Sequence, residues 1–344
     1  MDAPSKPASP DPAAAVEQAR ALEILRSARR FVLVGHVRPD GDCLGSQGAL
    51  ARGLIGLGKE VTILNADKPA PAFDYLTRVL PYRVYAGGEL PPHDVVALLD
   101  FNELSRTGPM AAAIARAGSQ KLVVDHHPFQ GAPWWDASYV DVSAAATGVL
   151  VWRILRALGA PLDALVARAV FTTLVTDTGW FRYSNTDRET FALAGELVAL
   201  GAEPARIFGA LFQRRPMEEP GALARVLARH EYFLGGRLVV VDQPLPVDGQ
   251  LGLDDGDPVL DILRGVERVE VVLYLRETEP GSCKLSARSK TGFDVNALAR
   301  RFGGGGHVKA AGATIAGRLG EVRARVVAAA EEALGATAPE GNGA

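Results

Sequence analysis

The stretch FVLVGHVRPDGDCLGSQGALARGLIGLGKEVTIL, residues 31–64, decides the fold. It begins with the apolar run FVLVG (31–35) and continues with LGSQGALARGLIGLGKE (44–60), whose apolar residues have helical spacing. It ends with a second apolar run, VTIL (61–64). A strand, a helix and a strand in this order predict two parallel strands joined by a crossover helix.

Further apolar runs extend this pattern along the chain. VVALL (95–99) and LVV (122–124) follow at intervals that suit more β–α units, and from about 144 to 232 the pattern is mostly helical. Strand-like runs then return at RLVVVD (237–242), RVEVVLYLRE (268–277) and CKLSARS (283–289). The alternation predicts an α/β fold, with a parallel doubly wound sheet in a first domain and a smaller α/β domain after it.

A chain of 344 residues usually folds as two domains. We expect the first domain at residues 19–186, a helical connector at 187–232 and the second domain at 233–335. The ends, 1–18 and 336–344, are rich in small residues and proline, which predicts disordered tails.

Composition and charge argue against several classes of protein. The net charge of −3 gives no general attraction to long duplex nucleic acid or to an anionic membrane, so an anionic substrate requires a local basic patch. No stretch is apolar over the length of a membrane span, and the N-terminus lacks the apolar core of a signal peptide. Cys43 and Cys283 stand in no metal-ligand spacing. These features predict a cytoplasmic protein with two reduced thiols.

Ionisable side chains follow three of the predicted strands of the first domain, and one more closes a helical stretch. They are His36, Asp40 and Asp42 after the first strand, Asp100 after the third, Asp125, His126 and His127 after the fourth, and Asp177 in TDTGWFRYSNT. Ligands of open α/β sheets bind at the carboxyl ends of the strands, so these side chains are expected to share one site.

Four aspartates in one site could not all ionise cheaply, because like charges a few ångströms apart raise each other's pKa. Divalent cations remove this penalty. Imidazole and carboxylate ligands without thiolate suit Mn²⁺ or a related metal, and the number of ligands is too large for one ion. A pair of ions about 3.5–4 Å apart, which share an aspartate, is a common arrangement for phosphate-ester hydrolysis.

Five segments resemble motifs of the DHH phosphoesterase superfamily in order and spacing. GHVRPDGDCLGS, LLDFNE, VVDHHP and TDTGWFRYSNT are similar to its four catalytic-domain motifs, and CKLSARSKTGFDVNALARRFGGGGHVKAAGA is similar to the DHHA1 domain. The resemblance covers about residues 20–335, and its two-domain length is most similar to the NrnA-like branch of oligoribonucleases and 3′-phosphoadenosine-5′-phosphate (pAp) phosphatases.

The resemblance implies a role for each candidate residue and an active site in the cleft between the two domains. His36, Asp40 and Asp100 would bind one Mn²⁺, and Asp42, Asp100, His126 and Asp177 the other, with Asp100 as the bridge. Asp125 is expected to orient the His126 ring. His127 is expected to face the scissile phosphate, where it would assist the leaving group or orient the phosphate.

The resemblance also implies the reaction. The expected activity is Mn²⁺-dependent hydrolysis of short oligoribonucleotides (nanoRNA, or linear dinucleotides such as pApA and pGpG) to 5′-mononucleotides, and removal of the 3′-phosphate of pAp. A homodimer is a further expectation from the family.

The second domain carries a local basic patch. Between residues 283 and 325 there are nine Lys or Arg against two acidic residues, Asp294 and Glu321. Arg288 suits a two-pronged bond to a phosphate, and the backbone of a glycine-rich run can approach a phosphate closely. The residues predicted to bind substrate are Arg288, Ser289, Lys290, Gly304, Gly305, Gly306 and His307, together with Arg182 of the first domain, for which packing is an equal alternative.

Other functions remain open from the sequence. A family II inorganic pyrophosphatase would share the first-domain motifs but would carry a different second domain, and a RecJ-like single-strand exonuclease would have a longer chain. A non-catalytic nucleotide-binding module is a third alternative, which the complete set of ligand motifs disfavours.

Overall fold

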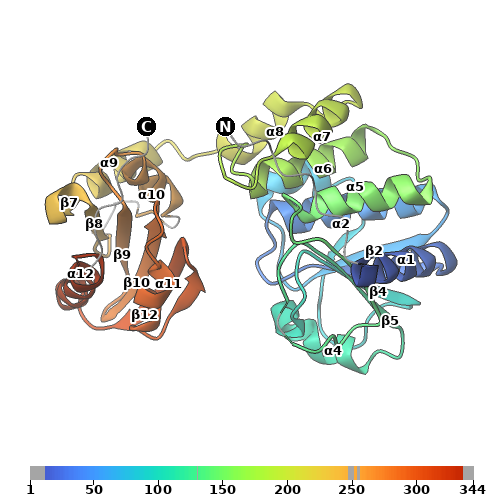
Figure 1. The fold of residues 1–344 in the computed structure, drawn as a ribbon, viewed down its shortest axis with the longest axis horizontal. Coiled ribbons are helices and arrows are strands. Elements are labelled where there is room, and N and C mark those ends of the chain that lie inside the picture. Colours follow the sequence, from blue (N-terminus) through green and yellow to red (C-terminus); the bar gives the residue numbers. More distant parts are fainter. Residues whose placement is uncertain (1–11, 130, 247–251, 254–255, 336–344) are drawn as a thin grey trace. The chain divides into compact units, whose positions relative to one another are not determined.

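The computed structural model describes residues 12–129, 131–246, 252–253 and 256–335. The chain forms two compact units, Met1–Arg214 and Arg215–Ala344, and each unit has its own sheet (Figure 1).

The first unit is built on a six-stranded sheet. Its elements are α1 (Pro12–Ser27), β1 (Arg30–Val34), α2 (Gly41–Gly56), β2 (Glu60–Asn65), the 3₁₀-helix η1 (Pro71–Phe73), α3 (Asp74–Thr77), β3 (Tyr82–Val84), β4 (Val95–Leu99), the 3₁₀ segment η2 (Leu104–Met110), α4 (Ala111–Arg116), β5 (Gln120–Asp125), β6 (Ala137–Val140), α5 (Thr147–Leu158), α6 (Ala164–Asp177), α7 (Arg188–Ala199) and α8 (Pro204–Phe212).

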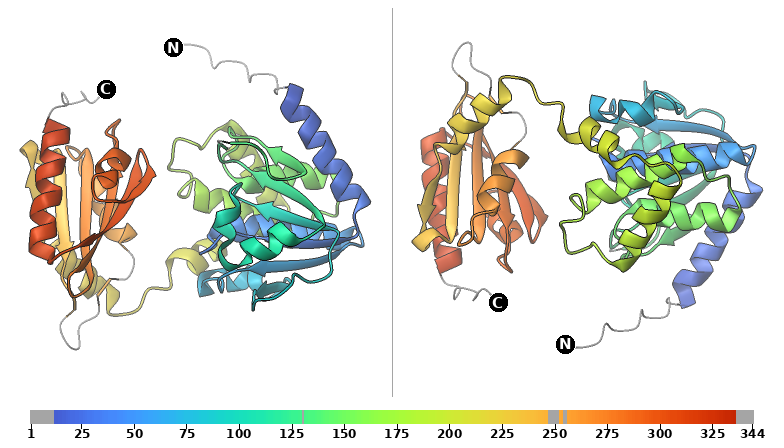
Figure 2. Two further views of the ribbon diagram at one scale, coloured as in Figure 1. Left: turned by 90° about the horizontal axis from the view of Figure 1, so that it is seen from below. Right: turned by 90° about the horizontal axis from the view of Figure 1, so that it is seen from above.

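All strands of this sheet run parallel, in the order β3-β2-β1-β4-β5-β6. Alternate residues of β1 are buried on opposite faces: Phe31 and Leu33 belong to the core beneath α2, α5 and α6, and Val32 and Val34 to the core beneath η2 and α4. Figures 1 and 2 show these helical layers on the two sides of the sheet. The predicted parallel, doubly wound sheet is therefore confirmed.

Glycines allow three helices of the larger layer to approach one another closely. A Cβ atom at Gly45 of α2 would lie 2.5 Å from Cγ2 of Thr173 in α6, and one at Gly148 of α5 would lie 1.8 Å from Oγ1 of the same threonine. Only a residue without a side chain fits such contacts. They bring α2 and the start of α5 against α6, whose last residue is Asp177.

The second unit is built on a mixed sheet in the order β11-β12-β10-β9-β8-β7. Its elements are α9 (Glu219–Leu227), β7 (Glu231–Phe233), the 3₁₀ segment η3 (Leu234–Gly236), β8 (Leu238–Gln243), α10 (Asp257–Arg264), β9 (Val271–Glu279), β10 (Ser282–Ser289), α11 (Val295–Arg300), β11 (Gly305–His307), β12 (Ala310–Ala316) and α12 (Leu319–Gly335). The pair β8–β9 is parallel and the other pairs are antiparallel.

The two faces of this second sheet are covered unequally. On one face, residues of β8, β9, β10 and β12 pack beneath α11 and α12, and on the other face residues of β8 and β9 pack beneath α9 and α10. On that other face, Lys284, Ser286 and Arg288 stand at alternate positions of β10 and, with residues of β12 and Gly304 and Gly305, line an open cavity of about 500 Å³.

The strands expected from the long apolar runs are present, whereas the short strands β3, β6, β7 and β11 and the longer strand β12, which is rich in Ala and Gly, were not predicted. The expected connector, 187–232, divides between the units: α7 and α8 fall in the first and α9 in the second. Residues 12–18, expected within a tail, form the start of α1, and the rest of the two predicted tails lies outside the described residues. The domain boundaries stay a prediction.

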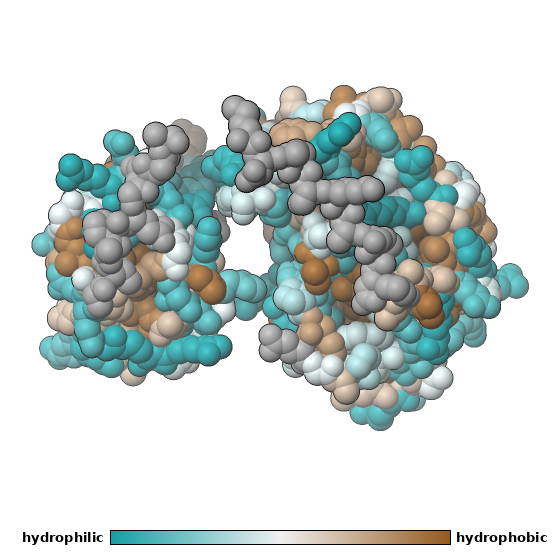
Figure 3. Space-filling view, in the orientation of Figure 1, coloured by the Kyte–Doolittle hydropathy of each residue, from teal (hydrophilic) through white to brown (hydrophobic). Residues whose placement is uncertain are grey.

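No described helix is both long enough and apolar enough to cross a membrane. The exposed large apolar side chains of the first unit include Phe191 and Val198 of α7 and Phe208 and Phe212 of α8. Apolar residues are visible over this part of the unit in Figure 3. Cys43 and Cys283 are buried, and neither forms a disulfide.

Candidate metal centre

The site lies where the strand order of the first sheet reverses. Strand β1 pairs with β2 on one side and with β4 on the other, so the loops that follow β1 and β4 diverge above the sheet. The first loop carries His36 and Asp40, and the second begins with Asp100. The expectation that these residues meet at the carboxyl ends of the strands agrees with this topology.

A first group of ligand-type atoms comes from these two loops. His36 Nε2 lies 3.6 Å from Oδ2 of Asp100 and 3.8 Å from Oδ1 of Asp40. The His36 side chain is buried, and its other ring nitrogen, Nδ1, lies 2.9 Å from the carbonyl oxygen of Val37. The three residues form a group that could hold a metal ion.

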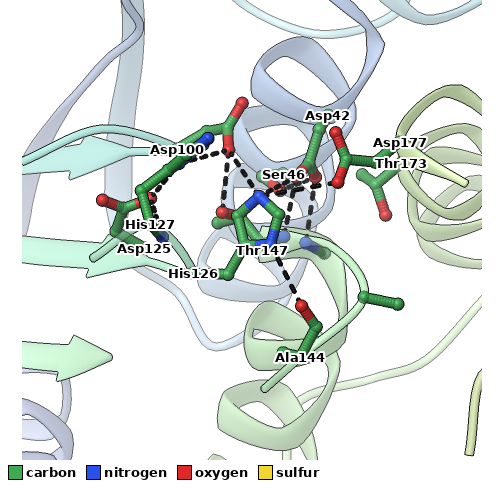
Figure 4. A network of polar contacts seen from close by, with 12 residues as sticks. Asp42, Ser46, Asp100, Asp125, His126, His127, Ala144, Thr147, Thr173 and Asp177 are labelled. Atoms are coloured by element: carbon green, nitrogen blue, oxygen red, sulfur yellow. Dashed lines mark hydrogen bonds and ion pairs between the residues drawn. The ribbon is translucent and has the colours of Figure 1, made fainter. Parts of the chain in front are cut away.

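A second group surrounds His126 (Figure 4). Its Nε2 atom lies 3.6 Å from Oδ1 of Asp100, 3.6 Å from Oδ2 of Asp177 and 3.7 Å from Oδ2 of Asp42. Asp100 therefore faces both groups, with Oδ2 toward His36 and Oδ1 toward His126. This is the arrangement that a bridging carboxylate requires.

The donor atoms fit a cation. Nδ1 of His126 lies 3.0 Å from the carbonyl oxygen of Ala144, so Nδ1 is a donor, and in the neutral ring the lone pair of Nε2 points at the carboxylates. That Nε2 atom is buried and has no hydrogen-bond partner among the residues that the structure describes. Distances of 3.6–3.7 Å exceed those of an N–H···O bond, and a lone pair facing three acceptors is unfavourable unless a cation lies between them.

The charges of the site also favour a cation. Burial lowers the pKa of His36, but the carboxylates of Asp100 and Asp40 outweigh it and raise this pKa to about 10. Burial raises the pKa of Asp177 to about 6, with His126 opposing the rise and Asp100 adding to it. The site thus favours a positive charge beside its histidines and resists several ionised carboxylates unless such a charge is present.

Asp42 is held by the beginning of α5. Its carboxylate accepts hydrogen bonds from the backbone N–H of Thr147 (2.7 Å), the backbone N–H of Gly148 (3.1 Å) and the hydroxyl of Ser46 (3.1 Å). The positive end of the helix dipole stabilises a carboxylate at this position. Burial and the neighbouring Asp100 nevertheless raise the pKa of Asp42 well above its usual value.

Asp125 contacts His127, and the expectation that it orients His126 is wrong. Oδ1 of Asp125 accepts from Nδ1 of His127 (2.8 Å) and from its backbone N–H (3.1 Å), whereas the His126 ring is held by the Ala144 carbonyl. The physical reason is that β5 ends at Asp125 and the chain bends at residue 127. The Asp125 side chain accepts from the backbone N–H two residues on, as in an Asx-turn, and this brings the His127 ring to the carboxylate.

A buried polar network fixes this pair. The Nδ2 amide of Asn102 donates to Oδ2 of Asp125 (2.7 Å) and to the carbonyl oxygen of His127 (3.2 Å). Nε1 of Trp134 in turn donates to the carbonyl oxygen of Asn102 (2.9 Å). Asp125 is fully buried, whereas the His127 side chain is 45% exposed, so the free edge of its ring can reach a substrate.

The residues predicted to bind substrate differ in their surroundings. Arg288 lines the open cavity of the second unit. Ser289 is buried and donates to the Thr291 carbonyl, and Lys290 donates to the carbonyls of Val266 and Glu267, so the structure gives both residues local structural roles. Arg182 lies in the turn after α6, where its Nε donates to the Gly179 carbonyl and its guanidinium lies over the Tyr183 ring.

The glycine run has a packing function of its own. A Cβ atom at Gly304 would lie 2.1 Å from the carbonyl oxygen of Gly312, and one at Gly306 would lie 2.5 Å from that of Ala310. Gly305 and His307 are exposed and pair with β12. Close pairing of β11 with β12 therefore requires Gly304 and Gly306, whatever the run binds.

Several residues of the site were missed from the sequence. Asn102 and Thr147 are buried and contact the predicted ligands or their neighbours, and Ser46 bonds Asp42. Asn102 stands in the quoted motif LLDFNE, two residues after Asp100, which is a usable signal. The Ala144 carbonyl has no signal in the sequence, since every residue carries one.

Two family models match this chain. The model described as DHH family, N-terminal domain, matches residues 30–175, and that of the DHHA1 domain matches residues 254–336.

Relatives of known name extend over both units. The bifunctional oligoribonuclease and PAP phosphatase NrnA of Thermus thermophilus is 34% identical over 319 residues, which cover 91% of this chain and 93% of that protein. The Bacillus subtilis protein of the same name is 25% identical over 292 residues, which cover 83% of this chain and 89% of that protein.

A solved structure shares the fold. The exopolyphosphatase-related protein from Bacteroides fragilis superimposes with a TM-score of 0.81 at 23% identity, covering 93% of this chain and 96% of that one. The family models and the Thermus thermophilus relative decide the classification. This chain belongs to the DHH family of phosphoesterases, and it is a hydrolase of phosphoester bonds in which a DHHA1 domain follows the DHH domain.

Proposed function

We propose that this protein is a Mn²⁺-dependent phosphoesterase that hydrolyses short oligoribonucleotides to 5′-mononucleotides and removes the 3′-phosphate of pAp. The observation that carries the proposal is the pair of His/Asp groups that share Asp100. It occurs in a chain that is 34% identical, over most of its length, to a bifunctional oligoribonuclease and PAP phosphatase.

Two divalent cations fit the two groups. His36, Asp40 and Asp100 would hold one, and Asp42, Asp100, His126 and Asp177 the other. When bound, such a pair activates a water molecule for attack on phosphorus and offsets the charge that develops on the phosphoryl oxygens. The ligand set, imidazole and carboxylate without thiolate, favours Mn²⁺ among the metals that hydrolases use.

His127 is the residue proposed to contact the scissile phosphate. Its Nδ1 atom is engaged by Asp125, which fixes the plane of the ring and leaves the opposite edge for the substrate. A ring fixed in this way holds a phosphoryl oxygen or the leaving oxygen with little loss of rotational freedom on binding.

The second unit is proposed to bind the rest of the substrate. Arg288 and Lys284 stand on the same face of β10 and line a cavity of about 500 Å³ whose floor is made of small residues of β12. Arginine is suited to a two-pronged bond with a phosphate. Ser289 and Lys290 are left out of this proposal because neither lines this cavity. The cytoplasmic location and the homodimer stay predictions.

A product time course tests the function. Purified protein with Mn²⁺ is given pAp, 5′-labelled RNA of two to five nucleotides, longer RNA or pyrophosphate, in separate reactions. We expect phosphate from pAp and mononucleotides from the short RNA. Phosphate from pyrophosphate alone would identify a pyrophosphatase, and processive degradation of long RNA or single-stranded DNA would identify a RecJ-like exonuclease.

Variants connect the activity to the site. Asp42→Ala should abolish turnover of every substrate, whereas Asp74→Asn, which changes an aspartate of α3 that pairs with Arg78, should not. Equal hydrolysis by wild type and Asp42→Ala would exclude this site as the active site. Binding of nucleotide without turnover by the wild-type protein would favour a non-catalytic module.

A further inference from the structure

Thr147 is the first residue of α5, it is fully buried, and it contacts both halves of the site. Its backbone N–H donates to Oδ2 of Asp42 (2.7 Å), and its hydroxyl donates to Oδ1 of Asp100 (3.0 Å). One residue outside the predicted ligand set therefore holds the carboxylate proposed to bridge the ions and a carboxylate of the second group (Figure 4).

The orientation of the Asp100 carboxylate decides whether it can serve both groups. Oδ1 must face His126 while Oδ2 faces His36, as the distances of 3.6 Å from each histidine show. The terminal torsion of an aspartate is broad, so it needs an external contact to fix it. Within the described part of the chain, the Thr147 hydroxyl is the hydrogen-bond donor to this carboxylate.

The backbone of Asp100 indicates the same constraint. Its φ angle is +71°, a left-handed conformation that a residue with a side chain rarely adopts. Such a conformation persists where the surrounding structure requires it. The strained backbone aims the Asp100 side chain at the site, and the Thr147 hydroxyl fixes its rotation.

The hydroxyl is itself held on a rigid support. The next residue, Gly148, lies so close to Thr173 of α6 that a Cβ atom there would be 1.8 Å from the Thr173 hydroxyl oxygen. Gly148 also donates its backbone N–H to Asp42 (3.1 Å). The beginning of α5 therefore has little freedom to move relative to α6 and Asp42.

We propose that Thr147 is a positioning residue: its hydroxyl fixes the Asp100 carboxylate so that each oxygen faces one metal-binding group. The inference rests on the proposed metal centre. Thr147 has no proposed contact with substrate. Its hydroxyl acts on Asp100, and its backbone N–H acts on Asp42.

Three variants test the hydroxyl. Thr147→Val keeps the shape of the side chain and the backbone N–H but removes the donor, and Thr147→Ser keeps the donor. Thr172→Val is the matched control, because Thr172 is a buried threonine of α6 whose hydroxyl bonds the Arg168 carbonyl and Tyr75 instead of a carboxylate. Each protein is stripped of metal and titrated with Mn²⁺ by calorimetry, and its two-equivalent complex is examined by electron paramagnetic resonance.

Loss of a contact that orients a metal ligand typically weakens metal affinity by about 10–100-fold. We expect a loss of this size for at least one Mn²⁺ in Thr147→Val, together with loss of the exchange-coupled spectrum of a carboxylate-bridged pair. Thr147→Ser should bind two ions with nearly wild-type affinity, and so should Thr172→Val.

The outcomes separate this inference from the proposed function. Two coupled ions of unchanged affinity in Thr147→Val would overturn the role of the hydroxyl while leaving the metal centre intact. Equal losses in Thr147→Val and Thr147→Ser would also overturn it, since they would trace the effect to packing. Failure of the wild-type protein to bind two ions would instead refute the proposed metal centre.

Discussion

Asp125 Oδ1 accepts a hydrogen bond from Nδ1 of His127 at 2.8 Å, and the two residues lie two positions apart at the end of β5. This contact gives the two histidines of the Asp-His-His sequence different orienting groups. His126 faces the aspartates of the site and is oriented by a backbone carbonyl, while His127 is oriented by Asp125.

The first prediction concerns Asp125→Asn. Because the carboxylate contacts His127 and not the His126 ring, the variant should lower kcat by about 10–100-fold while Mn²⁺ affinity stays near the wild-type value. Steady-state kinetics and a Mn²⁺ titration on the same preparation measure the two effects. A parallel loss of metal affinity would restore the alternative in which Asp125 supports His126.

The second prediction concerns Asn102→Ala. The change leaves the buried Asp125 carboxylate without its amide donor, and a buried group deprived of its partner costs about 1–3 kcal/mol. Urea unfolding should show that loss. Trp134→Phe is the control, because it removes one bond to the Asn102 carbonyl. An equal or larger loss of unfolding free energy in Trp134→Phe would show that the tryptophan, and not the Asn102–Asp125 bond, is responsible for the stability.

The third prediction concerns the close approach of α5 and α6. A Cβ atom at Gly148 would overlap Thr173, so Gly148→Ala should lower the free energy of unfolding by about 1–3 kcal/mol through overpacking. Gly195→Ala, in α7, has open space around the new methyl group and should stabilise the helix by about 0.5–1 kcal/mol. Similar changes in the free energy of unfolding for both variants, measured with urea, would contradict the close packing of Gly148 on Thr173.

The fourth prediction concerns metal removal. The proposed Mn²⁺ site exists in the folded protein only, so Mn²⁺ should raise the melting temperature of the chelator-treated protein in a concentration-dependent way. At about 100 times the dissociation constant, one site contributes about 2.7 kcal/mol. Asp177→Asn should reduce this shift, since Asp177 faces His126 in the second group. An undiminished shift in the variant would remove Asp177 from the ligand set.

The fifth prediction separates two basic residues that are close in the sequence. Arg288→Ala should raise KM for pAp by about tenfold or more, because a hydrogen bond to a charged group is worth about 1.5–3 kcal/mol. Lys290→Ala should leave KM unchanged and lower stability slightly, since its ammonium group bonds the backbone carbonyls after α10. Equal KM values for the two variants would count against the open cavity as the substrate site.

The sequence predicted the site from the ionisable residues that follow the predicted strands. The apolar runs that became β1, β4 and β5 are long enough to recognise, and the residues after them meet because parallel strands end at one edge. The short strands were missed because three or four residues carry little periodicity. In the glycine run, which was expected to bind a phosphate, Gly305 and Gly306 lie in the edge strand β11 instead of a free turn.

The contacts that orient the ligands were less accessible from the sequence. The Ala144 carbonyl that holds His126 is a backbone atom, and the contact of Thr147 with Asp100 joins residues 47 positions apart. Both depend on how α5 packs on α2 and α6, which follows from the tertiary structure and not from local pattern. The Asp125–His127 contact follows from the tendency of aspartate to bond the backbone two residues on, although the family resemblance pointed elsewhere.

The shared position of Asp100 has a consequence for how the centre fills. Because one carboxylate belongs to both groups, occupation of one group changes the free energy of binding at the other, and thermodynamic linkage makes this coupling equal in both directions. In the proposed centre the two ions would therefore be linked ligands of one protein. A substitution at His36 that weakens binding of an ion to the first group would therefore also change the metal affinity measured at the His126 group.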